Sequence, residues 1–226
     1  MRRHALLLLL ATAASSQDAS EPARLLHEAE ACANRRAYAK ARQLYRKILE
    51  QFPDSAEVAV AARRGKANAF LRAWVLEENG PHERRIDVYV MGDGFPMEDQ
   101  DKFDDWADKT AKILFKVDVF QRYRKYFNLR AMNLLSEEDG VDDPMGKREH
   151  STALDAKSLG GGGQVYIDAG LVFDFLNNEV KDHDNLAIIL VKRGVLGTGG
   201  GGLATTGRPD RTTIVHEWGH AFAGLL

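Results

Sequence analysis

The run Leu186-Ala187-Ile188-Ile189-Leu190-Val191 contains only apolar side chains. A strand that is covered by helices on both faces has this composition, because neither face is left for water. A strand at the surface would instead alternate between apolar and polar residues. We therefore expect residues 186–191 to form a strand that is buried inside a sheet.

Candidate strands and candidate helices alternate on both sides of this run. The strand candidates are residues 86–91, 127–135 and 203–206, and the helix candidates are residues 97–115, 171–180 and 212–225. Strand candidates that are separated by amphipathic segments with helical spacing are typical of layered α/β domains. We expect a mixed sheet with helices packed on it over residues 84–226, and residues 203–206 at the edge of that sheet.

Two glycine runs, Gly160 to Gly163 and Gly199 to Gly202, interrupt this pattern. Glycine is unfavourable inside regular elements, so we expect both runs to be loops. They are either flexible connections or mobile rims around a cleft. Neither run is followed by the lysine and the serine or threonine of a phosphate-binding loop, which argues against nucleotide binding.

Residues 21–76 differ from the rest in composition and predict a small all-α segment. They are rich in alanine, leucine, arginine and glutamate, and the pattern breaks at Asn79-Gly80-Pro81. One set of positions resembles the packing residues of a tetratricopeptide unit: Tyr38, Ala41, Tyr45, Ile48, Leu49 and Pro53. A single unit cannot bury its own faces, so it either packs on the next domain or docks a protein partner. A plain helical hairpin without a binding role fits the pattern equally well.

The first residues have the order of a secretory signal peptide, which we assign to residues 1–16. Arg2 and Arg3 precede the apolar run 5–10, and small residues follow it. The alternative is a buried N-terminal helix, since the run is too short to span a membrane. The only cysteine, Cys32, can form no internal disulfide. These features favour a secreted or periplasmic protein of a bacterial envelope.

Acidic and basic residues are nearly balanced, with a formal net charge of −2. No basic excess is available to attract nucleic acid or an anionic membrane, so we expect neither partner. The balance favours a neutral substrate or a protein substrate. The acidic stretches 98–108 and 137–143 are expected to be solvated faces.

The segment His216-Glu217-Trp218-Gly219-His220 carries the chemistry of the sequence. Pro209 and the capping side chains after it predict that a helix starts near Thr212. Histidines four residues apart lie on one face of a helix, so both imidazoles can reach one metal ion. Zinc suits imidazole ligands, and a catalytic zinc keeps a position for a water whose pKa falls to about 7. Glu217 lies beside that position, where it can act as general base and then as general acid.

The stretch from Thr212 to Leu225, TTIVHEWGHAFAGL, resembles the active-site helix of secreted zinc peptidases of the IgA-specific metalloendopeptidase type. Three further landmarks match this family in order, namely Gly92 to Phe95, then Phe120 to Tyr123 with Tyr126 to Asn128, and Thr152 to Leu154. The resemblance implies a zincin-like fold for residues 84–226, zinc held by His216 and His220, and Glu217 as the catalytic acid and base. It also implies a protein or peptide substrate. It does not extend to the N-terminal helices.

In this family the motif continues into an acidic segment, which we take from the resemblance to supply a third metal ligand. Here the sequence ends at Leu226, so we expect the catalytic domain to be incomplete at its C-terminus. Catalytic zinc normally has three protein ligands. Unless His150, His183 or an upstream carboxylate completes the set, the metal should bind weakly and the chain should hydrolyse little.

Three residues outside the motif are candidates for lining the substrate cleft. Asp93 lies between two glycines at the end of a strand, which suits either a turn or a cleft-lining carboxylate. Ala204 and Thr205 belong to the expected edge strand, which an extended substrate could join through backbone hydrogen bonds.

The sequence therefore predicts a zinc-dependent metallopeptidase that hydrolyses peptide bonds with Glu217 as general base. The alternative from another class is a catalytically inactive secreted scaffold that binds proteins through residues 21–76. A zinc hydrolase that acts on another bond also stays open, because a metal and a base do not by themselves select an amide.

Overall fold

The computed structural model describes residues 19–65, 68–143, 145, 148–158, 164–180, 182–193 and 196–224. The signal peptide expected at residues 1–16 and the glycine run 160–163 lie outside these residues. Among the helices that are described, none is long and apolar enough to cross a membrane.

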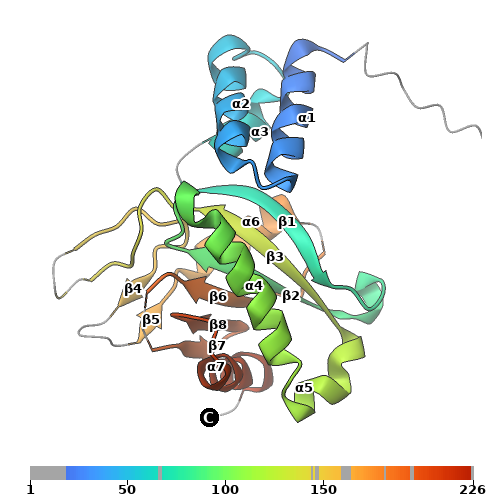
Figure 1. Cartoon of the computed structure of the whole chain (residues 1–226), viewed down its shortest axis with the longest axis vertical. Coiled ribbons are helices and arrows are strands. Elements are labelled where there is room, and N and C mark those ends of the chain that lie inside the picture. Colours follow the sequence, from blue (N-terminus) through green and yellow to red (C-terminus); the bar gives the residue numbers. More distant parts are fainter. Residues whose placement is uncertain are drawn as a thin grey trace, which may run out of the picture.

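A six-stranded mixed sheet forms the centre of the molecule (Figure 1). Its strands follow the order β1 (Ala69–Glu77), β3 (Phe127–Leu135), β2 (Ile86–Asp93), β6 (Leu186–Val191), β8 (Leu203–Thr206) and β7 (Thr198–Gly200). The inner strands β3, β2, β6 and β8 are parallel, and β1 and β7 run antiparallel to their neighbours at the two edges. A separate two-stranded sheet joins β4 (Lys157–Ser158) to β5 (Val165–Tyr166).

Helices cover both faces of the sheet, as the apolar run of β6 predicts. On one face, α4 (Gln100–Leu114) and α7 (Arg211–Ala223) share a core with strand residues such as Val88. On the other face, α6 (Ala169–Glu179) shares a core with the strand residues that alternate with these, such as Tyr89. Successive side chains of a strand point to opposite faces, so β2 and β6 are buried on both sides. The layered α/β class is confirmed.

Three helices precede the sheet and lie at one end of it, next to β1 (Figure 1). They are α1 (Glu21–Asn34), α2 (Tyr38–Gln51) and α3 (Val58–Gly65), and they have an apolar core of their own around Tyr45 and Ile48. The remaining short elements are η1 (His82–Arg84), η2 (Met97–Asp99), α5 (Asp118–Tyr123) and η3 (Arg124–Tyr126).

The prediction of a helical segment over residues 21–76 is wrong for its last part, because residues 69–76 belong to β1. Their apolar residues suit a helix locally. However, β3 offers β1 backbone partners along its whole length, from Leu135 opposite Ala69 to Leu129 opposite Glu77. This pairing between distant parts of the chain overrides local helix propensity.

A buried polar network fastens the helical unit to the sheet. The carboxylate of Asp104, in α4, has no exposed surface and accepts a hydrogen bond from the Tyr38 hydroxyl at 3.0 Å. The same carboxylate pairs with Arg72 at 2.9 Å and with Arg36 at 3.0 Å, and the Asn133 amide donates to its other oxygen at 2.8 Å. A buried carboxylate is costly unless it is paired, so these contacts favour one fixed position of the helices.

The C-terminal hairpin differs from the expectation in two respects. Strand β8, expected at the edge of the sheet, lies between β6 and β7. Gly199 and Gly200, expected in a loop, belong to β7, which is itself the edge strand. The chain turns from β7 into β8 at Gly201 and Gly202, whose φ angles of 57° and 85° suit glycine. The second glycine run is therefore part of a hairpin.

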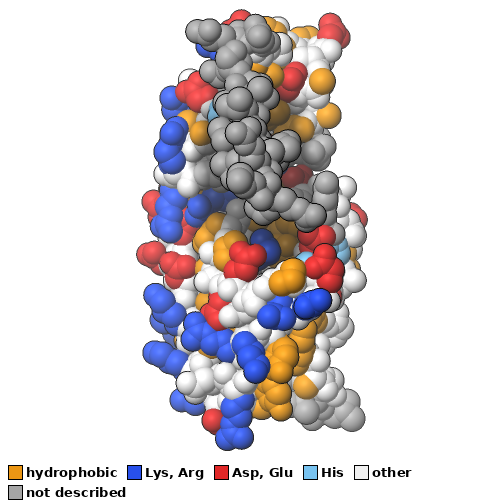
Figure 2. Space-filling view, turned by 90° about the vertical axis from the view of Figure 1, so that its right-hand side faces the viewer, with side chains coloured by type: hydrophobic (Ala, Val, Ile, Leu, Met, Phe, Trp, Pro, Cys, Tyr) orange, Lys and Arg blue, Asp and Glu red, His pale blue; other side chains and the backbone are white. Residues whose placement is uncertain are grey.

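The surface carries both signs of charge. On the face shown in Figure 2, acidic and basic side chains are interspersed, and apolar atoms gather toward the lower end. Large apolar side chains line a groove between α5 and α7, including the exposed residues Val119, Tyr123, Tyr126 and Phe222.

Candidate active site

Helix α7 holds the motif on a well-anchored element. The Asp210 carboxylate accepts a hydrogen bond from the Thr213 amide at 3.0 Å and so caps the N-terminus, and Gly224 ends the helix with a φ of 61°. Ile214 and Trp218 are buried beneath the helix. The predicted helix start near residue 212 is thus confirmed, and the motif has one face in the core.

The imidazoles of His216 and His220 lie next to each other on α7. Their Nε2 atoms are 3.1 Å apart and their ring centroids are 4.6 Å apart. A tetrahedral zinc ion with Zn–N bonds of about 2.0–2.1 Å would hold two nitrogens roughly 3.3–3.4 Å apart. The two imidazoles therefore fit one metal ion with little movement. His216 is exposed and His220 is half-buried, so solvent reaches the pair.

Glu217 is 9% exposed and packs against the hairpin. A Cβ atom added to Gly197 would lie 2.5 Å from Cγ of Glu217. One added to Gly199 would lie 2.2 Å from the Glu217 carbonyl oxygen and 2.9 Å from Cβ of His220. Only glycine lets β7 approach α7 this closely. These two glycines were not among the expected site residues, and their one signal in the sequence is that they lie shortly before the motif.

In the part of the chain that the structure describes, His216 and His220 belong to no group of three metal-ligand side chains. Among the described residues, the one group of three His, Cys, Asp or Glu ligand atoms within 4.8 Å of one another is elsewhere, at His82, Asp87 and Asp184. His183 instead pairs with the side chain of Asn177 at 3.2 Å. Neither His183 nor His150 therefore completes a set with His216 and His220 in this conformation.

Asp93 is a buried carboxylate that accepts several hydrogen bonds and lines no cleft. It has no exposed surface, and it accepts hydrogen bonds from the Thr152 hydroxyl at 2.9 Å and from the amides of Leu154 and Ala156 at 2.8 and 3.0 Å. Burial raises the pKa of Asp93 to about 6, although these donors pull it down. The cleft-lining interpretation is wrong because the carboxylate is needed to hold residues 152–156 against the end of β2.

Ala204 and Thr205 do not line a cleft either. Ala204 is 1% exposed and packs in the core beneath α7. Thr205 is 3% exposed, and its hydroxyl accepts a hydrogen bond from the Thr198 amide at 2.9 Å. Because β7 covers the outer edge of β8, these residues fix the hairpin instead of meeting solvent.

A sequence model of the family described as IgA Peptidase M64 matches residues 75–226. The chain belongs to this family. No curated protein matches the chain in a sequence search. The IgA Peptidase M64 match begins within β1 and includes α7, so it contains the histidine pair and the hairpin.

Membership of the IgA Peptidase M64 family has three direct consequences. The chain is a peptidase, and so a hydrolase. Its substrates are proteins or peptides, and its chemistry involves a metal ion. The match leaves α1, α2 and α3 outside, so the helical unit is an addition to the matched region.

Proposed function

We propose that the chain is a zinc-dependent metallopeptidase in which His216 and His220 hold the ion and Glu217 is the general base. The observation that carries the proposal is the 3.1 Å separation of the two Nε2 atoms on one helix, with Glu217 next to the first histidine. Two neutral imidazoles are a good zinc pair. The proposal includes a third protein ligand besides the two histidines, because catalytic zinc normally has three.

The bound metal would polarise the scissile carbonyl and lower the pKa of the attacking water. In this proposal, the carboxylate of Glu217 accepts a proton from that water and returns it to the leaving amine. Its burial against the hairpin supports the role, because a carboxylate held at a fixed place needs no reorganisation during the proton transfer.

Strand β7 is the proposed docking edge for an extended substrate. It is the edge of the sheet, it runs antiparallel to β8, and it packs directly against the motif helix at Gly199. An exposed edge offers backbone N–H and C=O groups to a peptide strand. A peptide paired there would pass close to His220, which suits cleavage of a peptide bond better than hydrolysis of an isolated ester.

Two parts of the proposal rest on the sequence. Export to a secreted or periplasmic location rests on the order of residues 1–16. Docking of a protein partner on the tetratricopeptide-like helices rests on their packing pattern, and the exposed Lys40 and Arg46 of α2 supply polar surface for it. The scaffold alternative would keep only this second role.

The replacement Glu217→Gln tests the role of the general base. We expect kcat/KM for an unfolded protein substrate to fall by about 10²–10⁴-fold while zinc binding is retained, because general acid–base catalysis typically contributes that much. Zinc is measured by mass spectrometry after equilibrium dialysis. Glu98→Gln, at an exposed glutamate of η2, is the matched control and should keep full activity. Equal turnover of Glu217→Gln and the parent chain would overturn the proposal.

A further inference from the structure

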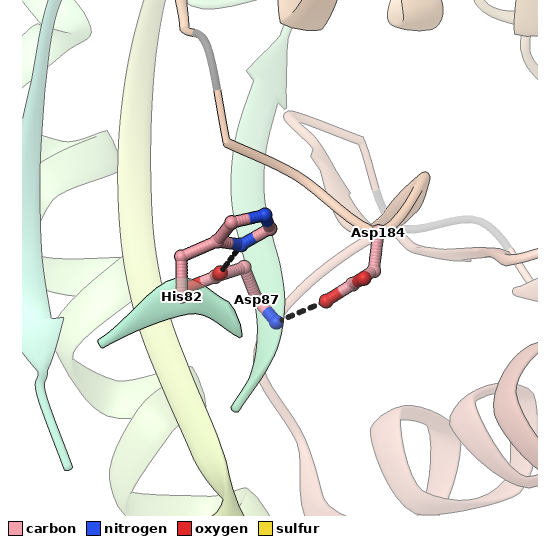
Figure 3. A group of neighbouring side chains, drawn as sticks. All are labelled: His82, Asp87 and Asp184. Carbon is pink, nitrogen blue, oxygen red and sulfur yellow. Dashed lines mark hydrogen bonds and ion pairs between the residues drawn. The ribbon is translucent and has the colours of Figure 1, made fainter. Parts of the chain in front are cut away.

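A second cluster of metal-ligating side chains lies away from the motif helix. It consists of His82 in η1, Asp87 near the start of β2, and Asp184 just before β6, drawn in Figure 3. Their ligand atoms all lie within 4.8 Å of one another. The sequence gives no sign of this cluster, because Asp184 is 97 positions after Asp87 and only the parallel pairing of β2 with β6 brings them together.

The cluster lies on the opposite face of the sheet from α7. Val88 packs in the core that contains α7, and Tyr89 packs in the core that contains α6. Since side chains alternate along a strand, Asp87 points to the α6 face, together with Tyr89. The Tyr89 hydroxyl donates to the Asp182 carbonyl at 3.1 Å, which agrees with this placement. The cluster is therefore separate from the candidate active site.

The carboxylate of Asp87 is held in place by groups behind it. Asp87 has no exposed surface, and one oxygen accepts a hydrogen bond from the Asn128 amide at 2.9 Å. Asn128 is fixed in turn, because it donates to the Gly80 carbonyl at 3.0 Å and accepts from the Asn79 amide at 2.8 Å. Metal ligands are typically oriented by outer partners of this kind. The other oxygen of Asp87 meets Nδ1 of His82.

The charges around the cluster favour a cation. Asp87, Asp182 and Asp184 are three carboxylates in this small region, and Asp182 and Asp184 are exposed. Among the described residues, Arg130 is a neighbouring cation, and its Nε is 3.9 Å from an oxygen of Asp87. Asp184 Oδ2 already accepts the Asp87 amide at 2.7 Å, which brings a second carboxylate beside the first. A divalent ion would offset this negative charge.

We propose that His82, Asp87 and Asp184 form a second metal site, which binds a zinc-type divalent ion and joins η1 to the starts of β2 and β6. One imidazole nitrogen and two carboxylates are ligands that zinc accepts, whereas calcium and magnesium prefer oxygen ligands alone. Tetrahedral ligation would need ligand atoms about 3.3–3.6 Å apart, so side-chain shifts of roughly 1 Å would place the three ligand atoms around one ion. His82 is 31% exposed and Asp184 is exposed, which leaves both side chains room to move.

The test uses the chain with His216→Ala and His220→Ala, so that zinc at the candidate active site does not contribute. We expect one equivalent of zinc after equilibrium dialysis, and a rise of about 5–10 °C in Tm at zinc 100-fold above the dissociation constant. Adding His82→Gln or Asp184→Asn should remove both effects. Adding Asp182→Asn, a neighbouring exposed carboxylate, should leave one equivalent bound. The Tm of each variant without zinc shows that it is folded.

Two results would overturn the second site. One is the absence of stoichiometric zinc in the His216→Ala, His220→Ala chain, with no change in Tm. The other is zinc or calcium binding that persists after His82→Gln, since the ion would then be held by surface carboxylates without the imidazole. Neither result bears on Glu217, whose role is tested by turnover of the parent chain.

Discussion

At the scale of single residues, buried polar groups decide how the site is held. Asp93 was expected to line a turn or a cleft, and it anchors residues 152–156 to the end of β2 through several donors. The sequence could place Asp93 after a strand, because the strand pattern is local. It could not reveal the donors, because they come from a loop that is 59 to 63 positions further along the chain.

Burial of Asp93 makes stability depend on pH. The pKa of Asp93 is raised to about 6 from an ordinary value of 3.8, so the folded state binds this proton more tightly than the unfolded state. The contribution is fully present below pH 3.8 and is lost as the pH rises through 6. Asp93→Asn lacks this dependence, and its NH2 group faces either the Leu154 or the Ala156 amide donor, which costs about 1–3 kcal/mol.

Urea unfolding of both chains from pH 4 to pH 7 measures this effect. The free energy of unfolding of the parent chain, minus that of Asp93→Asn, should decrease as the pH rises. Other titrating groups cancel in the difference. A difference that is constant or that increases with pH would contradict the raised pKa of Asp93.

At the scale of elements, the contact between β7 and α7 determines where the motif lies. Strands β3 and β6 and helix α7 have the bounds that the sequence predicts, or nearly so, because their apolar patterns are local and strong. Strand β7 was missed because glycine has low strand propensity. Strand β7 is rich in glycine because the motif helix approaches it closely, and this approach is a property of the tertiary structure.

Two alanine substitutions in β7 separate this contact from a general effect on the strand. Gly199→Ala places Cβ 2.2 Å from the Glu217 carbonyl oxygen, whereas Cβ at Gly200 meets nothing within 4 Å. We expect Gly199→Ala to lower the free energy of unfolding by about 1–3 kcal/mol and to reduce peptidase activity, because α7 must shift. Gly200→Ala should change stability by less than about 0.5 kcal/mol. Equal effects in thermal unfolding and activity assays would contradict the close contact.

At the scale of the whole molecule, the Asp104 network joins the helical unit to the layered domain. The sequence predicts a helical segment, and it leaves open whether that segment packs on the next domain. In the structure the helical unit does pack on the domain. The buried carboxylate of Asp104, in α4, contacts Tyr38 and Arg36 of the helical unit and Arg72 of β1. Contacts between distant parts of the chain also explain the error over residues 69–76, because β1 is a strand through its pairing with β3.

Removal of the Asp104 carboxylate should loosen this connection. Asp104→Ala leaves Arg72, which is 9% exposed, without its buried partner, and we expect a cost of about 3–5 kcal/mol. Tyr38→Phe should cost roughly 1–2 kcal/mol, because one hydrogen bond to a charged group is lost. Asp105→Asn, at an exposed carboxylate in the same helix, is the control. Calorimetry should show the helical unit unfolding earlier in Asp104→Ala, and an unchanged transition would contradict the network.

The central claim is that His216 and His220 share one zinc ion. It is tested most directly by anomalous diffraction at the zinc absorption edge, from crystals of the chain grown with zinc. We predict an anomalous peak about 2.0–2.1 Å from Nε2 of both histidines. A map in which both imidazoles face solvent without a peak, even if zinc is present at His82, would contradict the claim.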